Sequence, residues 1–271
     1  MPIYNMHTHI FPQKIAKKAT DSIGQFYDIP MEMIGTSEAL LNGGREIGVE
    51  KYLVCSVATK AAQVESIYSF VADECRKHPE FIGYGSLHPD CENIEKEVDN
   101  LVKLGLKGIK LHPDFQLFNI DDEKAMPIYE QASERGLPIL CHMGDNRYTY
   151  SHPSRLMKVM KRFPKLIVIA AHLGGYQAWD DAEKCELDGR PYFGNENMFI
   201  DTSSSLPFVD PVRAVKIIRR HGVERTFFGT DSPMWNEKKE LERFMALPLT
   251  DDEKEKILGI NAKRFLAETA T

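Results

Sequence analysis

Two histidines lie two residues apart in the first apolar segment of the chain, MHTHIFP at residues 6–12. Alternate side chains of an extended strand point to the same face, so His7 and His9 are expected on one side and Thr8 on the other. Two neutral imidazoles fill an apolar core poorly, whereas together they offer two nitrogen ligands to a metal ion. The motif is short, so other parts of the chain have to supply the remaining ligands.

Further polar side chains stand at the ends of later apolar runs. Lys110 and His112 end the run GIKLHP, and His142 stands in PILCHMG. His172 stands in LIVIAAHLGG, and Asp231 in TFFGTDSP. Each has a simpler interpretation: a hydrogen-bonded structural histidine, a lysine that reaches solvent, or an aspartate that starts a turn. Taken together, three imidazoles and one carboxylate form a shell typical of a divalent metal, with one position left for water.

The apolar runs that carry these residues belong to a regular alternation. Eight runs are separated by segments of helical pattern, at residues 3–10, 52–58, 81–87, 108–113, 138–144, 166–175, 198–204 and 226–233. Most runs are continuously apolar, which is typical of parallel strands covered on both faces. The segment 60–78 has helical apolar spacing, and 210–222 has Asp210 as N-cap and Gly222 as helix end.

This alternation predicts an α/β fold with one (β/α)₈ TIM barrel as a single domain over residues 1–271. A doubly wound open sheet is the competing fold, but neither a G-x-G-x-x-G loop nor a Walker loop is present. Catalytic groups of such barrels come from the carboxyl ends of several strands. The two long connections that follow strands, 11–35 and 176–197, are therefore expected over the mouth of the barrel.

Composition limits the classes of partner. The chain has 271 residues, 42% of them hydrophobic and 27% charged, and a net charge of -6, which argues against nucleic acid and anionic membranes. No apolar run approaches the roughly 20 residues of a spanning helix, and the N-terminus lacks the pattern of a signal peptide. Five cysteines without a C-x-x-C pair indicate reduced thiols. We therefore expect a cytoplasmic protein with a small-molecule substrate; a homo-oligomer is compatible with this composition.

The motifs HTH, GIKLHP, CHMG, AHLGG and GTDSP, in this order, resemble the amidohydrolase superfamily. Within it they are similar to the branch of small predicted metal-dependent hydrolases that is related to aminocarboxymuconate-semialdehyde decarboxylase. The terminal stretch ILGINAKRFL at 257–266 resembles the closing helix of that branch. The resemblance runs from Met6 to Leu266, and its motifs are specific for the family rather than for a substrate.

The resemblance implies a metal centre whose ligands are His7, His9, His142 and Asp231. Zinc is the expected ion. His172 would stand over the open coordination position, as acid/base and oxyanion contact or as a ligand of a second ion. Lys110 matches a strand on which some members carry a carboxylated lysine between two metals; we expect one zinc and an uncarboxylated lysine. TatD-like nucleases share the H-x-H motif but carry a glutamate on this strand, which argues against a nuclease.

Such a centre supports hydrolysis of a small carboxylated amide, ester or lactone, which is the first expectation. A bound divalent ion lowers the pKa of water from 15.7 to about 7, Asp231 can act as general base, and His172 can stabilise the developing oxyanion. The same shell can bind a carboxylate while carbon dioxide leaves. A non-oxidative decarboxylase or hydratase of a small unsaturated or aromatic acid is therefore the alternative. A barrel that only binds ligands or buffers metal is the third hypothesis.

Three residues are candidates for substrate binding. Lys110 and His112 are separated by one apolar residue, so alternation places both on one face near the site. Arg147, in GDNRYTY after the fifth apolar run, could anchor an acidic group of the substrate, because arginine binds carboxylates in bidentate fashion. An exposed arginine that forms a salt bridge within its loop is an equally good interpretation.

Overall fold

Eight parallel strands form one sheet in the computed structural model, which describes residues 2–269. The neighbours in this sheet follow chain order, and every adjacent pair within it is parallel. The strands are β1 (Ile3–His9), β2 (Val49–Cys55), β3 (Phe81–Ser86), β4 (Gly108–Leu111), β5 (Ile139–Cys141), β6 (Val168–Ala170), β9 (Met198–Asp201) and β10 (Thr226–Phe227). Two short strands, β7 (Glu186–Leu187) and β8 (Arg190–Pro191), form a separate antiparallel hairpin.

Hydrogen bonds between β1 and the segment after β10 close the sheet into a barrel. The amide of Met6 donates to the carbonyl of Phe228 at 2.9 Å, and the amide of His9 donates to Ser232 at 2.7 Å. In the opposite direction the amide of Asp231 donates to the carbonyl of His7 at 2.9 Å. The predicted (β/α)₈ barrel is confirmed, and the open doubly wound sheet is excluded.

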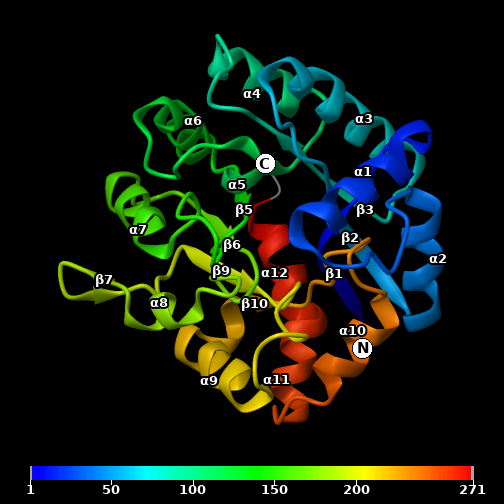
Figure 1. Ribbon diagram of the computed structural model, residues 1–271, viewed down its shortest axis with the longest axis vertical. Helices are drawn as coiled ribbons and strands as arrows, with labels where there is room; N and C mark the ends of the chain where they lie inside the picture. Colours follow the sequence, from blue (N-terminus) through cyan, green and yellow to red (C-terminus); the bar gives the residue numbers. More distant parts are fainter. Residues whose placement is uncertain (1, 270–271) are drawn as a thin grey trace.

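Helices surround the strands (Figure 1). They are α1 (Gln13–Tyr27), α2 (Ser37–Ile47), α3 (Val64–Lys77), α4 (Ile94–Lys103), α5 (Pro113–Gln116), α6 (Met126–Arg135), α7 (Pro153–Arg162), α8 (Trp179–Lys184), α9 (Pro211–His221), α10 (Glu237–Met245), α11 (Asp251–Glu255) and α12 (Asn261–Glu268). The sequence signals locate several of their ends: Asp210 caps α9 through the amides of Val212 and Arg213. Within residues 2–269, no helix combines the length and apolar character needed to cross a bilayer.

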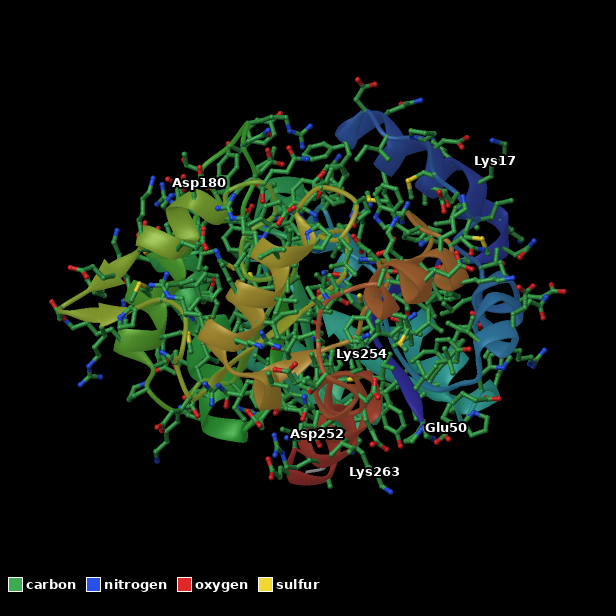
Figure 2. The ribbon with its side chains drawn as sticks, turned by 90° about the horizontal axis from the view of Figure 1, so that it is seen from below. Lys17, Glu50, Asp180, Asp252, Lys254 and Lys263 are labelled. Carbon is green, nitrogen blue, oxygen red and sulfur yellow. The ribbon has the colours of Figure 1, made fainter. Side chains whose placement is uncertain are left out.

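The inside of the barrel is filled with apolar side chains at the end opposite to the predicted site. Met6, Leu53, Tyr84, Leu140, Ile169 and Phe227 form a buried cluster there. Phe265 of α12 closes it, with its ring centroid 5.2 Å from that of Phe227. In Figure 2, Lys17 on α1 and Lys263 on α12 mark opposite ends of the molecule. One end of the barrel is therefore a packed core, and the other is free to hold polar groups.

The strands are shorter than the apolar runs that predicted them. The sixth run covers 166–175, but β6 ends at Ala170. His172 and Leu173 follow with positive φ angles of 61° and 50°, a backbone region that a strand cannot use. The apolar run continues through this turn because Leu173 is itself fully buried. His172 is therefore presented by a tight turn rather than by the strand.

The two long connections, 11–35 and 176–197, differ in their position relative to the mouth of the barrel. The segment 11–35 contains α1, which lies over the mouth and lines the large cavity there, as expected. The expectation for 176–197 is wrong for most of its length, because none of its residues lines that cavity. This connection packs against α7, where Lys161 forms an ion pair with Asp188 at 2.6 Å, and its β7–β8 hairpin projects at the periphery (Figure 1).

Two buried glutamates of α10 make the stability of the fold depend on pH. Burial raises the pKa of Glu237 and of Glu240 from the ordinary value of 4.5 to about 7. Between pH 4.5 and pH 7 the folded chain therefore binds more protons than the unfolded chain. The free energy of unfolding must therefore fall as the pH rises from about 4.5 through 7.

Replacing Glu237 by glutamine is expected to stabilise the protein at pH 8.5 by about 1–3 kcal/mol, because glutamine cannot ionise in this buried position. At pH 5 the gain should be much smaller, since Glu237 is then protonated in the folded state. Urea unfolding at the two pH values measures both differences. Glu242→Gln, on an exposed position of the same helix, is the control and should show no such dependence. A gain of equal size at pH 5 and pH 8.5 would contradict the assignment.

Candidate metal centre

Three of the four predicted metal ligands meet at the mouth of the barrel. His9 Nε2 lies 3.2 Å from Asp231 Oδ1, and His7 Nε2 lies 3.5 Å from the same oxygen. One ligand atom from each of the three residues lies within 4.8 Å of the others. The pairing of β1 with β2 shifts register between Asn5 and Thr8; His7 lies within this irregularity and His9 after it, and both imidazoles line the cavity at the mouth. The expectation that His7 and His9 share one side is confirmed.

The orientation of the His7 ring suits metal binding. Its Nδ1 lies 3.0 Å from Asp201 Oδ2, and an ionised carboxylate can only accept, so Nδ1 carries the hydrogen. The lone pair of Nε2 is therefore directed into the mouth. Burial, helped by the charge of Lys110, lowers the pKa of His7 to about 4. A neutral imidazole whose second nitrogen is fixed by a carboxylate is the usual form of a metal-ligating histidine.

Asp231 supplies an anionic oxygen to the same position. Burial alone would raise the pKa of its carboxyl, but the imidazoles of His7, His9 and His172 hold it well below the ordinary value. Ser204 Oγ donates to Asp231 Oδ2 at 2.5 Å and fixes the direction of the carboxylate. Two imidazoles and one oriented carboxylate fit a divalent ion such as zinc or manganese.

His142 and His172 form a second pair of imidazoles beside these ligands. His142 Nδ1 lies 2.9 Å from His172 Nε2. The other nitrogen of each ring lies 2.9 Å from a backbone carbonyl, that of Gly144 or that of Ser203. Carbonyls only accept, so these contacts favour the tautomers in which both facing nitrogens present lone pairs, an arrangement that suits a proton or a cation between them. In this position His142 faces His172 rather than Asp231, and its place in the ligand shell stays a prediction.

A second cluster of ligand atoms adjoins this pair. His112, Asp114 and His142 also bring one possible ligand atom each within 4.8 Å. The rings of His112 and His142 are stacked with centroids 4.0 Å apart, and His142 Nε2 lies 3.7 Å from Asp114 Oδ2. Burial raises the pKa of Asp114 to about 6. These residues could therefore hold the second ion that the sequence left as an alternative, although the cluster shares His142 with the His142–His172 pair.

Lys110 occupies the centre of the site, as its position in the sequence predicts. Its side chain is buried, and its Nζ lies 2.9 Å from His7 Nε2. Within residues 2–269 it forms no ion pair with a carboxylate. His112, the second predicted binding residue, also faces the cavity, where its Nε2 lies 2.9 Å from the hydroxyl of Tyr27. A buried ammonium group without a carboxylate partner suits an anionic ligand.

Arg147 does not line the cavity. Its guanidinium donates to both oxygens of Asp145, at 3.0 and 2.7 Å, so a neighbour two residues away already holds it in bidentate fashion. It also donates to the carbonyl of Phe26 at 2.5 Å and lies 4.6 Å from the centroid of that ring. Arg147 thus fastens α1 to the segment after β5. This placement favours the salt-bridge interpretation and argues against the predicted substrate anchor.

Several residues that shape the site were missed in the sequence. Asp201 accepts from the amides of His172 and Ser203, at 3.1 and 3.0 Å, in addition to holding His7. The signal for Asp201 was present, because it ends the strand MFID in the way that Asp231 follows the last apolar run. Tyr27 carried no such signal, since its contact with His112 joins residues 85 positions apart.

The predicted metal ligands and their polar neighbours form the floor of a cavity of about 630 Å³. Its polar end consists of His7, His9, Lys110, His112, His142, His172 and Asp231. Most of the remaining wall is apolar and comes from α1, the segment after β2, α3 and Phe115. A site with a few convergent polar groups and an apolar wall is typical of a small-molecule binding pocket.

A family model described as amidohydrolase matches residues 4–267. The chain belongs to the amidohydrolase family. A curated relative, a dihydroorotase from Buchnera aphidicola subsp. Schizaphis graminum, is 23% identical over 262 residues, which cover 88% of this chain and 71% of the relative.

Solved structures share the same fold. A 5-carboxyvanillate decarboxylase from Sphingomonas paucimobilis matches with a TM-score of 0.76 and 16% identity, over 98% of this chain and 99% of that chain. A dihydroxybenzoic acid decarboxylase from Polaromonas sp. JS666, with bound manganese and the inhibitor 2-nitroresorcinol, matches with a TM-score of 0.76 and 16% identity, over 98% and 97%. The family match confirms the predicted membership of the amidohydrolases, and these structures confirm the predicted barrel fold.

Asp201→Asn is expected to lower the affinity for zinc or manganese by about 10- to 100-fold, because asparagine can still accept from the amides of His172 and Ser203 but no longer places a carboxylate on His7 Nδ1. Competition with a chromophoric chelator measures the affinity, and circular dichroism checks the fold. The control is Asp188→Asn on the exposed β7–β8 hairpin, which should bind metal as the wild type does. Unchanged affinity in the Asp201 variant would show that this carboxylate does not support the ligands.

Proposed function

We propose that this amidohydrolase is a metal-dependent lyase that removes carbon dioxide, without oxidation, from a small aromatic or unsaturated acid. The observation that carries the proposal is the buried Lys110, which has no carboxylate partner in the described part of the chain and faces an apolar, partly aromatic cavity. The carboxylate of a substrate would supply the missing counter-charge, and its ring or double bond would pack on the wall. The names of the similar structures, which are decarboxylases of aromatic acids, support the same choice.

The chain's own residues account for most of the chemistry. A divalent ion held by His7, His9 and Asp231, with His142 as the expected fourth ligand, would polarise a substrate oxygen when bound. Lys110 Nζ would hold the substrate anion next to it. The bond between the carboxyl carbon and its neighbour then breaks, its electron pair stays on that neighbouring carbon, and this carbon takes a proton as carbon dioxide leaves. With His142 bound to the ion, His172 Nε2 would take up a proton from solvent and deliver it to that carbon, while the Ser203 carbonyl accepts from its other nitrogen.

Hydrolysis, which was the first expectation from the sequence, is supported less well and remains the second candidate. The dihydroorotase relative favours it, because a ring-opening hydrolase would use the same ligands. Asp231 is also suited to accept a proton from an attacking water, since its carboxyl is ionised. In either reaction α1 covers the mouth and limits the access of bulk water.

The two reactions differ in their products, which makes a direct test available. Purified protein loaded with zinc or with manganese is incubated with hydroxylated benzoates and, separately, with dihydroorotate and simple lactones. We expect one carbon dioxide per acid consumed and incorporation of one solvent deuterium at the carbon that lost the carboxylate. Hydrolysis of dihydroorotate or a lactone, without carbon dioxide from any acid, would replace the lyase by a hydrolase. Elemental analysis of the same samples tests the expected single ion per chain.

His172→Asn is expected to keep bound metal near the wild-type level but to lower kcat/KM by about a hundredfold or more, the scale for loss of a positioned acid/base group. Asparagine suits this position because it tolerates the positive φ of His172. Metal content and kinetics are measured on the same preparation. His78→Asn, at the end of α3, provides the control. Loss of metal in proportion to activity would instead assign His172 to the ligand shell.

A further inference from the structure

The cavity extends far beyond the metal ligands, along one face of α1. The residues of this helix that line it recur every three or four positions, which places them on a single face: Ile15, Lys18, Ala19, Ser22, Ile23, Phe26 and Tyr27. Ile15 and Tyr27 are twelve residues apart, so at 1.5 Å per residue this face is about 18 Å long. Its C-terminal end contacts the polar floor, where Tyr27 lies against His112 and His142.

The opposite wall of this extension comes from the start of α3 and the turn before it. Gln63, Ser66, Ile67 and Phe70 line the cavity and again share one helical face. Val57, after β2, lies on the same wall. Figure 1 shows α1 and α3 on the same side of the barrel. Two amphipathic faces thus border one elongated space, which we call the α1–α3 groove and define by Ile15, Ala19, Ile23, Ile67 and Phe70.

The side chains of this groove are apolar without being fully buried. Ile15 is 50% exposed, and Ile23, Ile67 and Phe70 are all partly exposed. Residues that can form hydrogen bonds, such as Lys18, Gln63 and Ser66, line the cavity beside these apolar side chains. A contiguous, partly exposed apolar strip that is continuous with a polar active-site floor is typical of a ligand-binding groove.

The size of the cavity also indicates a ligand larger than a single ring. At about 630 Å³ it lies within the range of about 300–1,000 Å³ found for sites that enclose drug-sized ligands. A one-ring acid bound at Lys110 would contact Phe115, Tyr27 and Phe26 at the polar end. Such a ligand would leave Ile15 and Ile67 uncovered.

We infer that the α1–α3 groove binds an unbranched alkyl substituent of the substrate. The substrate is then an acid whose reacting head lies at Lys110 and whose apolar tail extends between α1 and α3. An alkyl chain fits better than a second polar group, because isoleucine, alanine and phenylalanine side chains offer the groove's ligand no hydrogen bond. The inference that the reacting head is an acid rests on the proposed lyase function, whereas the inference of an alkyl tail rests on the groove alone.

Binding of unreactive acids to the metal-loaded protein tests this inference. Isothermal titration with benzoate and with its 3- and 4-alkyl derivatives, from ethyl to hexyl, measures the gain in affinity per methylene group. Transfer of a methylene from water to an apolar site corresponds to about a fourfold gain at most, so we expect about two- to fourfold per group in at least one of the two series. No gain with chain length in either series would overturn the inference.

Two variants test whether the groove residues produce this gain in affinity. Ile67→Ser and Phe70→Ser are each expected to reduce the ratio of hexylbenzoate to benzoate affinity by about fivefold or more. Val102→Ser removes a partly exposed apolar side chain on α4, outside the groove, and should leave this ratio unchanged. Circular dichroism confirms that each variant is folded. An unchanged ratio in both groove variants would place the tail elsewhere and overturn the inference.

The outcome is separable from that of the lyase proposal. A gain with chain length in a protein that releases no carbon dioxide from any acid would retain the groove and refute the lyase. Carbon dioxide release from short acids, with no gain for longer tails, would retain the lyase and refute the groove.

Discussion

The closure of the barrel between β1 and the segment after β10 is the constraint on which the metal centre depends. His7 and His9 lie at one end of the chain and Asp231 near the other, and two hydrogen bonds, His9 to Ser232 and Asp231 to His7, bring their backbones together. Because these bonds involve the ligand residues themselves, the seam sets the spacing of the ligands directly. A change that loosens this seam would therefore disturb the site before it disturbs the rest of the sheet.

Around this seam the polar groups hold one another in fixed directions. Asp201 serves both the His7 ring and the backbone of His172, while Ser204 fixes Asp231. Buried groups of this kind are costly unless paired, and most of them are paired within the chain. Lys110 is different: its ammonium contacts an imidazole but, among residues 2–269, no carboxylate. The site thus holds its own groups in place and still contains one buried ammonium without a carboxylate contact among the described residues, which suits a pocket for an acid.

The barrel and the wall of the cavity contribute differently to function. Structures only 16% identical to this chain share its fold over nearly their whole length, so the barrel tolerates extensive sequence change. The apolar wall instead comes from α1 and the start of α3, which are connections between strands. Arg147 fastens α1 to the segment after β5 through Asp145 and Phe26. We therefore expect selectivity for the substrate to depend on α1 and α3 rather than on the strands of the barrel.

The sequence by itself determined the barrel and most of the polar floor, because strand ends and helix caps are local signals that can be read from neighbouring residues. His7, His9, Lys110, His142, His172 and Asp231 all stand where an apolar run ends. Only the tertiary structure decided the rest. It paired His142 with His172, turned Arg147 away from the cavity, and brought Tyr27 to His112 and Asp201 to His7. Apart from the Arg147–Asp145 pair, these are contacts between residues distant in the chain, whose distances are set by packing and leave no local trace in the sequence.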